Sequence, residues 1–246
     1  MRKRHHFKTQ CSSSLRPQGT NPSFKMPFLL LFMMLSACAA SPQDLSGKMF
    51  TFPQETNTAR VMLNTSADNL SAVTVCLRSF TDLSRHHSLF SLATPSSDNG
   101  FLIFKDNSDK ISLYVDNKKV EYLALGYELN VWHSICSTWD VESGLGQMWL
   151  NGKSSPRKFL GGSRISQPIV ILGQEQDSYG GSFDTEQSFI GMISDVHMWD
   201  YVLSPCEIQS YVDNLNFTPG NVLNWRALTF DVIGRVLIEN RILTCH

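Results

Sequence analysis

The densest group of side chains that could do chemistry lies between residues 173 and 187. Glutamate, aspartate and glutamine gather there, and an aspartate–asparagine pair occurs earlier, at Asp98 and Asn99. The oxygen-bearing residues of the later segment are Glu175, Gln176, Asp177, Asp184 and Gln187. Ca²⁺ takes six to eight oxygen ligands at flexible geometry, and Gly180-Gly181 allows a tight turn. The pattern favours a calcium site, with a catalytic site or a solvated acidic loop as alternatives.

The catalytic alternative has weak support. Glu175 and Asp177 share a face at period two, but the third carboxylate that concanavalin-like glycosidases place on such a strand is missing. Without a proton donor opposite the nucleophile, the leaving group of a glycosidic bond cannot be protonated efficiently, so hydrolysis would be slow. There is no G-x-S-x-G nucleophile elbow, and the histidines after residue 40 lack zinc-ligand spacing. His86-His87 is expected on an exposed turn. We therefore expect a protein that is not an enzyme.

The first forty residues resemble processing sequence. Residues 27–35, PFLLLFMML, form an apolar run that is followed by small residues at 37–40. Such a run is typical of a signal peptide and is too short to span a bilayer stably. We expect a signal peptide within 1–40, an upstream extension at 1–25 with Met26 as an alternative start, and one secreted, extracellular domain at 41–246.

Removing that leader makes the chain acidic. All 22 acidic residues lie at or after Asp44, and six of the 21 basic residues lie before Cys38, so the mature net charge is 15 − 22 = −7. Nucleic-acid binding requires a basic footprint, so general affinity for nucleic acids is not expected.

Four cysteines and three sequons follow the leader. In an oxidising compartment cysteines pair by default. Cys76 and Cys136 lie in strand-like runs, and a bridge between them would close a 60-residue interval and stabilise the fold by about 4 kcal/mol. Cys206 and Cys245 could pair with each other or with another chain. N-glycosylation sequons begin at Asn64, Asn69 and Asn216.

Alternation of apolar and polar residues with period two dominates the mature chain and predicts strands. The predicted strands are 49–52, 73–80, 101–104, 111–115, 147–150, 170–172, 190–199 and 230–238, with another around Cys136. Asp116-Asn117 is expected as a turn and Asn151-Gly152 as a hairpin. Asp98-Asn99 is expected at the start of the strand at 101–104, although Asp98-Asn99-Gly100 on its own is also a good turn sequence. Ser204-Pro205-Cys206-Glu207 has the capping pattern of a helix start. We predict an all-β, two-sheet antiparallel jelly-roll sandwich of lectin type with one short helix.

The segment GQEQDSYGG at 173–181, with Phe183-Asp184 and Gln187-Ser188-Phe189 after it, closely resembles the calcium loop of the short pentraxin family. The segments DLSGK at 44–48 and MWD at 198–200 also resemble sequences of that family. The resemblance covers residues 43–240 and is nearest to the branch of serum amyloid P component and mucosal pentraxin. It implies a calcium-dependent pattern-recognition lectin of innate immunity and the acute phase, assembled as a homopentamer.

The resemblance also implies ligands and partners. It implies phosphate- or carboxylate-bearing ligands, such as phosphoethanolamine, acidic glycans, and microbial or apoptotic surfaces. Complement and Fc receptors are the implied protein partners. Two readings remain as alternatives: a structural or scavenging pentraxin whose site binds ligands weakly, and a glycoside hydrolase on the same fold.

Carried over by position, the resemblance implies two Ca²⁺ ions per protomer. The implied ligands of the first ion are Asp98, Asn99, Glu175, the backbone carbonyl of Gln176, and Asp177. The second ion would share Glu175 and Asp177 and add Asp184 and Gln187. Cys76 and Cys136 match the single intrachain disulfide of the family.

The chain departs from the family at several positions. In the signature H-x-C-x-[ST]-W-x-[ST], Ser134 replaces the histidine and Val141 replaces the last residue. In choline-binding members, an aromatic residue and a glutamate receive the choline. Phe104 matches the aromatic residue, but Lys119 stands at the place of the glutamate and would repel a quaternary ammonium. Tyr114 resembles the serum amyloid P pocket, so we expect phosphoethanolamine or acidic glycans to bind better than phosphocholine.

Overall fold

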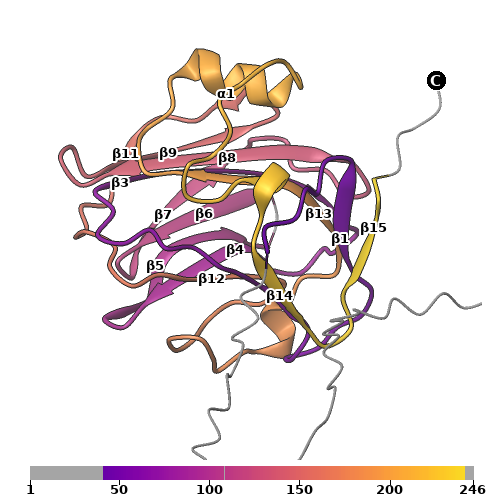
Figure 1. Cartoon of the computed structure of the whole chain (residues 1–246). Coiled ribbons are helices and arrows are strands. Elements are labelled where there is room, and N and C mark those ends of the chain that lie inside the picture. The colour runs from indigo at the N-terminus through magenta and orange to yellow at the C-terminus, as the bar shows by residue number, and fades with distance from the viewer. Residues whose placement is uncertain (1–40, 108, 242–246) are drawn as a thin grey trace, which may run out of the picture. The chain divides into compact units, whose positions relative to one another are not determined.

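The computed structural model describes residues 41–107 and 109–241, in which two antiparallel sheets pack face to face (Figure 1). Sheet I contains, in spatial order, β10 (Lys153–Ser154), β9 (Leu145–Leu150), β8 (His133–Asp140), β3 (Ala72–Phe80), β13 (Gly191–Trp199), β1 (Lys48–Phe52) and β15 (Leu237–Asn240), and β11 (Lys158–Phe159) also pairs with β9. Sheet II contains β14 (Phe230–Ile233), β2 (Arg60–Leu63), β12 (Ile169–Leu172), β4 (His87–Thr94), β5 (Ser97–Lys105), β6 (Lys110–Val115) and β7 (Lys118–Leu123). The predicted all-β sandwich is confirmed. The predicted signal peptide and Cys245 lie outside the described residues.

The core lies between the sheets because alternate residues of each strand face inward. On β5, Phe101 and Ile103 are fully buried in the core cluster, whereas Leu102 and Phe104 belong to the opposite face. Phe50 meets Trp225 and Phe230 edge to face, at centroid distances of 5.2 and 5.1 Å. Such aromatic pairs add stabilisation beyond the apolar area that they bury.

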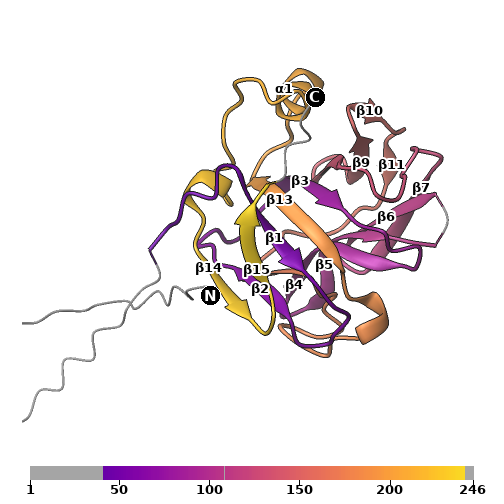
Figure 2. The ribbon, with the colours of Figure 1, turned by 90° about the vertical axis from the view of Figure 1, so that its right-hand side faces the viewer.

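The structure corrects two details of the predicted elements and decides a third. The strand predicted at 230–238 is two strands, β14 and β15, which belong to different sheets (Figures 1 and 2). Gly234 separates them with φ +74°, in the left-handed region that favours glycine, and Ala59 leaves little room for a side chain there. Asp98 and Asn99 lie at the start of β5, as expected, and not in the turn that Asp98-Asn99-Gly100 alone would also suit. His87 is fully buried in β4, not exposed on a turn.

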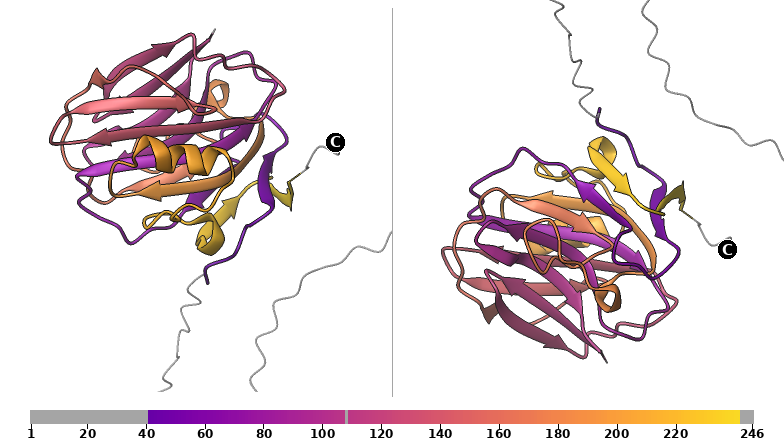
Figure 3. Two further views of the ribbon diagram at one scale, coloured as in Figure 1. Left: turned by 90° about the horizontal axis from the view of Figure 1, so that it is seen from above. Right: turned by 90° about the horizontal axis from the view of Figure 1, so that it is seen from below.

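One helix, α1 (Pro205–Val212), lies on the outer face of sheet I (Figure 3). Ser204 is its N-cap, and the reciprocal hydrogen bonds between Ser204 and Glu207 form the predicted capping box. Ile208 and Tyr211 are buried against Trp199 in a second apolar cluster. No helix among the described residues is long and apolar enough to cross a membrane.

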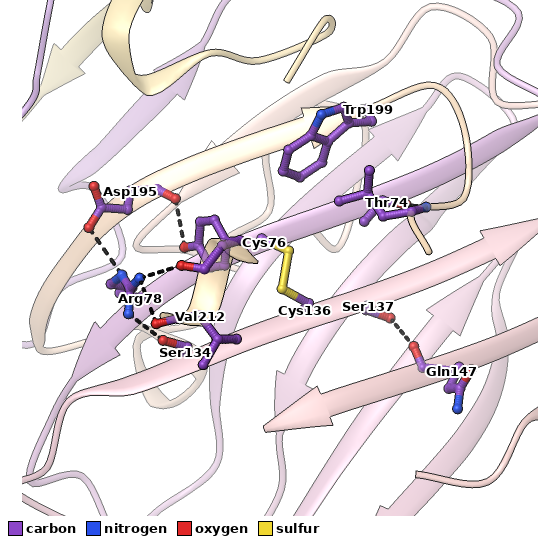
Figure 4. Close-up of a disulfide and its surroundings, with 12 residues drawn as sticks. Thr74, Cys76, Arg78, Ser134, Cys136, Ser137, Gln147, Asp195, Trp199 and Val212 are labelled. Carbon is purple, nitrogen blue, oxygen red and sulfur yellow. Dashed lines mark hydrogen bonds and ion pairs between the residues drawn. A yellow bond between two sulfur atoms is a disulfide. The ribbon is translucent and has the colours of Figure 1, made fainter. Parts of the chain in front are cut away.

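The disulfide between Cys76 and Cys136 lies beneath α1 and joins opposite residues of β3 and β8 (Figure 4). It confirms the pairing that the family resemblance implied. Cys206 is exposed and has no disulfide partner among the described residues.

Candidate calcium and ligand site

The candidate ligands gather on the outer face of sheet II, opposite the sheet that carries α1. A cavity of about 120 Å³ opens there. Its lining residues are Asn99, Leu102, Phe104, Tyr114, Glu175, Asp177 and Gln187. Strand β5 supplies the first three, β6 supplies Tyr114, and the loop after β12 supplies the last three. Four of the seven predicted metal-binding residues therefore line one cavity with two of the three predicted pocket residues.

Three side-chain oxygens at this site are buried without a hydrogen-bond partner. They are Oδ1 of Asn99, Oε2 of Glu175 and Oε1 of Gln187. A buried polar atom without a partner costs about 1–3 kcal/mol, and more when it is charged. Three such acceptors on one small cavity suit a cation, because oxygens of this kind are the ligands that Ca²⁺ prefers.

Several acidic side chains act on one another at the site. Burial, followed by the negative charge of Asp177, raises the pKa of Glu175. Burial also raises the pKa of Asp177, against the hydrogen bond with Glu175, and the charges of Asp98 and Asp184 add to the rise. Four carboxylates thus repel one another, and a divalent cation would relieve that repulsion.

Carboxylates alone do not form a complete metal site. No group of three histidine, cysteine or acidic side chains among the described residues is arranged to hold a metal ion. The amide oxygens of Asn99 and Gln187, together with the backbone carbonyl of Gln176, would therefore have to complete the shell. Asp98 and Asp184 are not among the lining residues, although their charges act on Glu175.

The side chain of Gln176 holds the loop in place and is not free to bind a metal. It is fully buried. Its Nε2 donates to the carbonyl oxygens of Ser91 and Ile169 at 3.2 and 3.1 Å, and its Oε1 accepts from the backbone N–H of Gly180. Only its backbone carbonyl could therefore serve as a ligand.

A short 3₁₀ turn, η1 (Thr185–Gln187), carries Gln187. Asp184 caps this turn by accepting from the backbone N–H of Glu186 at 3.0 Å. Arg85 donates from Nη1 to the carbonyl oxygens of Glu186 and Ser188 at 2.7 and 2.8 Å. These contacts connect the turn to the chain just before β4.

The apolar end of the cavity differs from the sequence expectation in two ways. Leu102, which the sequence reasoning missed, lines the cavity beside Phe104. The available signal was its position two residues before Phe104, on the same face of one strand. Lys119 does not line the cavity, although its ammonium lies 5.5 Å from the ring centre of Tyr114.

Lys119 is held by two carboxylates at the rim. Its Nζ lies 2.9 Å from Oε1 of Glu121 and 3.4 Å from Oδ1 of Asp106. Burial alone disfavours the charged form, but the hydrogen bond with Glu121 and the charge of Asp106 raise the pKa of Lys119.

The chain matches known proteins by family, by sequence and by structure. The family model described as the Pentaxin family matches residues 48–240. Serum amyloid P-component of Cavia porcellus is 42% identical over 221 residues, which cover 89% of this chain and 98% of that protein. C-reactive protein of Xenopus laevis is 42% identical over 218 residues, which cover 86% and 90%. The native heptameric SAP-like pentraxin from Limulus polyphemus has a TM-score of 0.72 and 26% identity over 79% of this chain and 95% of that one. The chain therefore belongs to the pentraxin family.

Proposed function

We propose that this pentraxin is a secreted pattern-recognition lectin that binds anionic ligands through calcium and is not an enzyme. The observation that carries the proposal is the set of three buried, unpartnered oxygens of Asn99, Glu175 and Gln187 on one cavity. Two Ca²⁺ ions would be held by the residues that the family resemblance named. Bound calcium would supply positive charge to an oxyanion on an otherwise acidic protein.

The cavity favours a ligand with an anionic head and a small amine or sugar beside it. The phosphate or carboxylate would lie towards Glu175 and Asp177, where the metal ligands gather. Leu102, Phe104 and Tyr114 would contact the rest of the molecule. Phosphoethanolamine and acidic glycans, including those on microbial or apoptotic surfaces, fit this division.

Calcium titration tests the proposal directly. Isothermal titration of the full protein should show binding, with dissociation constants of about 10⁻⁴–10⁻³ M, as for many extracellular calcium modules. Glu175→Gln should abolish or strongly weaken this binding. Glu186→Gln is the matched control, because Glu186 is an exposed glutamate of the same loop. Absence of binding, or equal binding by Glu175→Gln, would remove the lectin proposal, and absence of binding would leave the structural or scavenging alternative.

We also propose that protomers assemble head to tail into a ring, with five members as the family resemblance implies. Large apolar side chains are exposed at both ends of sheet I: Phe159 on β11 is 73% exposed, and Leu237 and Ile238 on β15 are 41% and 45% exposed. Two different patches at opposite edges suit a heterologous interface, which closes into a ring when the rotation permits. Native mass spectrometry gives the ring size.

Secretion and glycosylation complete the proposal. We propose removal of a signal peptide within residues 1–40, which N-terminal sequencing of the secreted protein would test. The sequon residues Asn64, Asn69 and Asn216 are all exposed and could carry glycans. A mass decrease on treatment with an N-glycosidase would show that at least one is occupied. Complement and Fc receptors remain proposed partners on family resemblance alone.

A further inference from the structure

A second and larger cavity lies on the opposite side of the protein, beside the C-terminal end of α1. Its volume is about 230 Å³, larger than the cavity of about 150 Å³ that is sufficient to bind benzene in an engineered protein. The polar and aromatic residues that line it include Arg78, Asp195, His197, Trp225, Arg226 and Arg241. Neither the calcium proposal nor the ring proposal uses these side chains.

The lining carries more positive than negative charge. Asp195 is its one carboxylate, and its Oδ2 lies 3.2 Å from Nε of Arg78 and 2.7 Å from Nη1 of Arg241. Arg226 is exposed and forms no ion pair with a described residue, and its guanidinium lies 5.7 Å from the ring centre of Phe217. Three arginines against one aspartate leave a formal charge of +2.

Asp44 is a further acidic group on this side of the protein. It lies outside the lining, near Arg226. If Asp44 is counted with the lining residues, the formal charge is +1. The local charge is therefore opposite in sign to that of the mature chain.

Arg78 is one of the lining residues and is held in place by several polar contacts (Figure 4). It is 6% exposed. Its Nη2 donates to the carbonyl oxygen of Tyr211 at 2.7 Å and to Oδ1 of Asn214 at 2.8 Å, and its Nη1 donates to Oγ of Ser134. Ser134 is one of the two residues that depart from the family signature, and here its hydroxyl is an acceptor for Arg78.

Two further donors at the cavity have no protein acceptor. Nδ1 of His197 accepts from the backbone N–H of Gly220 at 3.2 Å, so the neutral ring carries its proton on Nε2, which bonds no described residue. Trp225 is almost fully buried, and its indole Nε1 has no hydrogen-bond partner. Buried donors are normally satisfied, so the indole of Trp225 favours an acceptor-rich ligand, to which Nε2 of His197 could also donate.

A β-bulge in β13 turns the polar residues toward this side. Ile193 and Val196 are both in the core although they are three residues apart, which strict alternation would not allow. The extra residue places Asp195 and His197 on the cavity side, and Asp195 has φ +51°. Bulges commonly re-aim side chains next to functional sites.

We propose that this cavity is a second ligand site, which binds a small oxyanion of the size of phosphate without calcium. Guanidinium groups match the geometry of phosphate and carboxylate oxygens, and Arg226 is the arginine whose charge remains free. The site does not depend on the proposed calcium function, because it lies on the opposite sheet and uses none of its residues.

The test is titration of the full, calcium-depleted protein with inorganic phosphate. Isothermal titration should show one saturable site per protomer. The melting temperature should rise with phosphate and not with sodium chloride of equal ionic strength. Arg226→Gln removes an exposed charge without breaking an ion pair, so the variant should fold and bind phosphate at least fivefold more weakly. Arg164→Gln, an exposed arginine outside the lining, and Glu175→Gln should bind like the unmodified protein.

Two results would overturn the proposal. One is the absence of both saturable heat and a phosphate-specific thermal shift. The other is equal phosphate affinity in Arg226→Gln and the unmodified protein. Loss of phosphate binding in Glu175→Gln would place the anion at the calcium site and contradict the proposal too.

Discussion

Arg85 donates from Nη1 to the backbone carbonyl oxygen of Glu186 at 2.7 Å, across 101 residues of sequence. The same guanidinium pairs with Glu55 at 2.9 Å. Arg85 therefore fixes the turn that presents Gln187 to the cavity, although it lines no part of the cavity itself.

We predict that Arg85→Met lowers calcium affinity. Residues that orient metal ligands typically contribute 10–100-fold to metal affinity, and the turn would lose its connection to the chain before β4. Isothermal titration with Ca²⁺ should show a decrease of about tenfold. Arg157→Met, an exposed arginine elsewhere on the surface, is the control. Equal affinity in all three proteins would show that η1 keeps its position without Arg85.

The sequence predicted the residue types of the site better than its geometry. Hard oxygens on a loop with two glycines were sufficient to suggest calcium. The pattern of residues alone could not show that Asn99 reaches the loop after β12, which only the family resemblance implied, because that contact depends on β12, β4 and β5 being neighbours in sheet II. Nor could it show that Lys119 is held at the rim by Glu121 and Asp106.

We predict that phosphocholine binds weakly, because the ammonium of Lys119 over Tyr114 repels the quaternary ammonium of the ligand. Lys119→Ala should increase calcium-dependent retention on immobilised phosphocholine several-fold, since Glu121 and Asp106 would lose their common partner. Lys118→Ala, an exposed lysine next to it on β7, should leave retention unchanged. Strong retention of the unmodified protein, with elution by free phosphocholine, would contradict the prediction.

Ring assembly is predicted to depend on both edges of sheet I. Phe159→Glu and Leu237→Glu should each give monomers, because each places a charge in an apolar contact. Leu215→Glu is the control, since Leu215 is 58% exposed but lies near α1. Light scattering after size exclusion measures the mass. A ring that survives both substitutions would place the interface elsewhere.

Removal of the disulfide is predicted to destabilise the protomer by about 4 kcal/mol, because the bridge closes a loop of 60 residues. The measurement is the free energy of unfolding in urea for a variant with Cys76→Ala and Cys136→Ala. Cys206→Ser should unfold like the unmodified protein, because Cys206 is exposed and unpaired among the described residues. A similar loss of stability in Cys206→Ser would indicate that this thiol bonds another chain or the C-terminal segment.

The difference between the predicted and observed strands has a physical cause. Residues 230–238 alternate well enough to read as one strand, yet the chain turns at Gly234 and its two halves pair with different sheets. His87 was wrongly predicted on an exposed turn, because two adjacent histidines are typical of a solvent-exposed turn. Its ring is buried between Tyr127 and Phe189, at centroid distances of 6.4 and 5.6 Å. The local alternation of apolar and polar residues indicates that a segment is a strand. Which of two adjacent histidines is buried depends on tertiary packing.

That buried histidine predicts how stability changes with pH. Burial lowers the pKa of His87 to about 3, against an ordinary value of 6.5. The folded state therefore keeps His87 neutral, while the unfolded chain takes up a proton as the pH falls below 6.5. Through this group the free energy of unfolding is highest above about pH 6.5, and it decreases progressively as the pH falls toward 3.

Between pH 7 and pH 5 this single group should lower the free energy of unfolding by about 2 kcal/mol. His87→Asn should remove that part of the pH dependence, whatever its effect on stability at pH 7. His86→Asn, at the partly exposed neighbouring position, is the matched control and should keep the original slope. Urea unfolding of calcium-depleted protein at the two pH values measures each slope. Identical slopes in all three proteins would mean that His87 takes up its proton in the folded state as easily as in the unfolded chain.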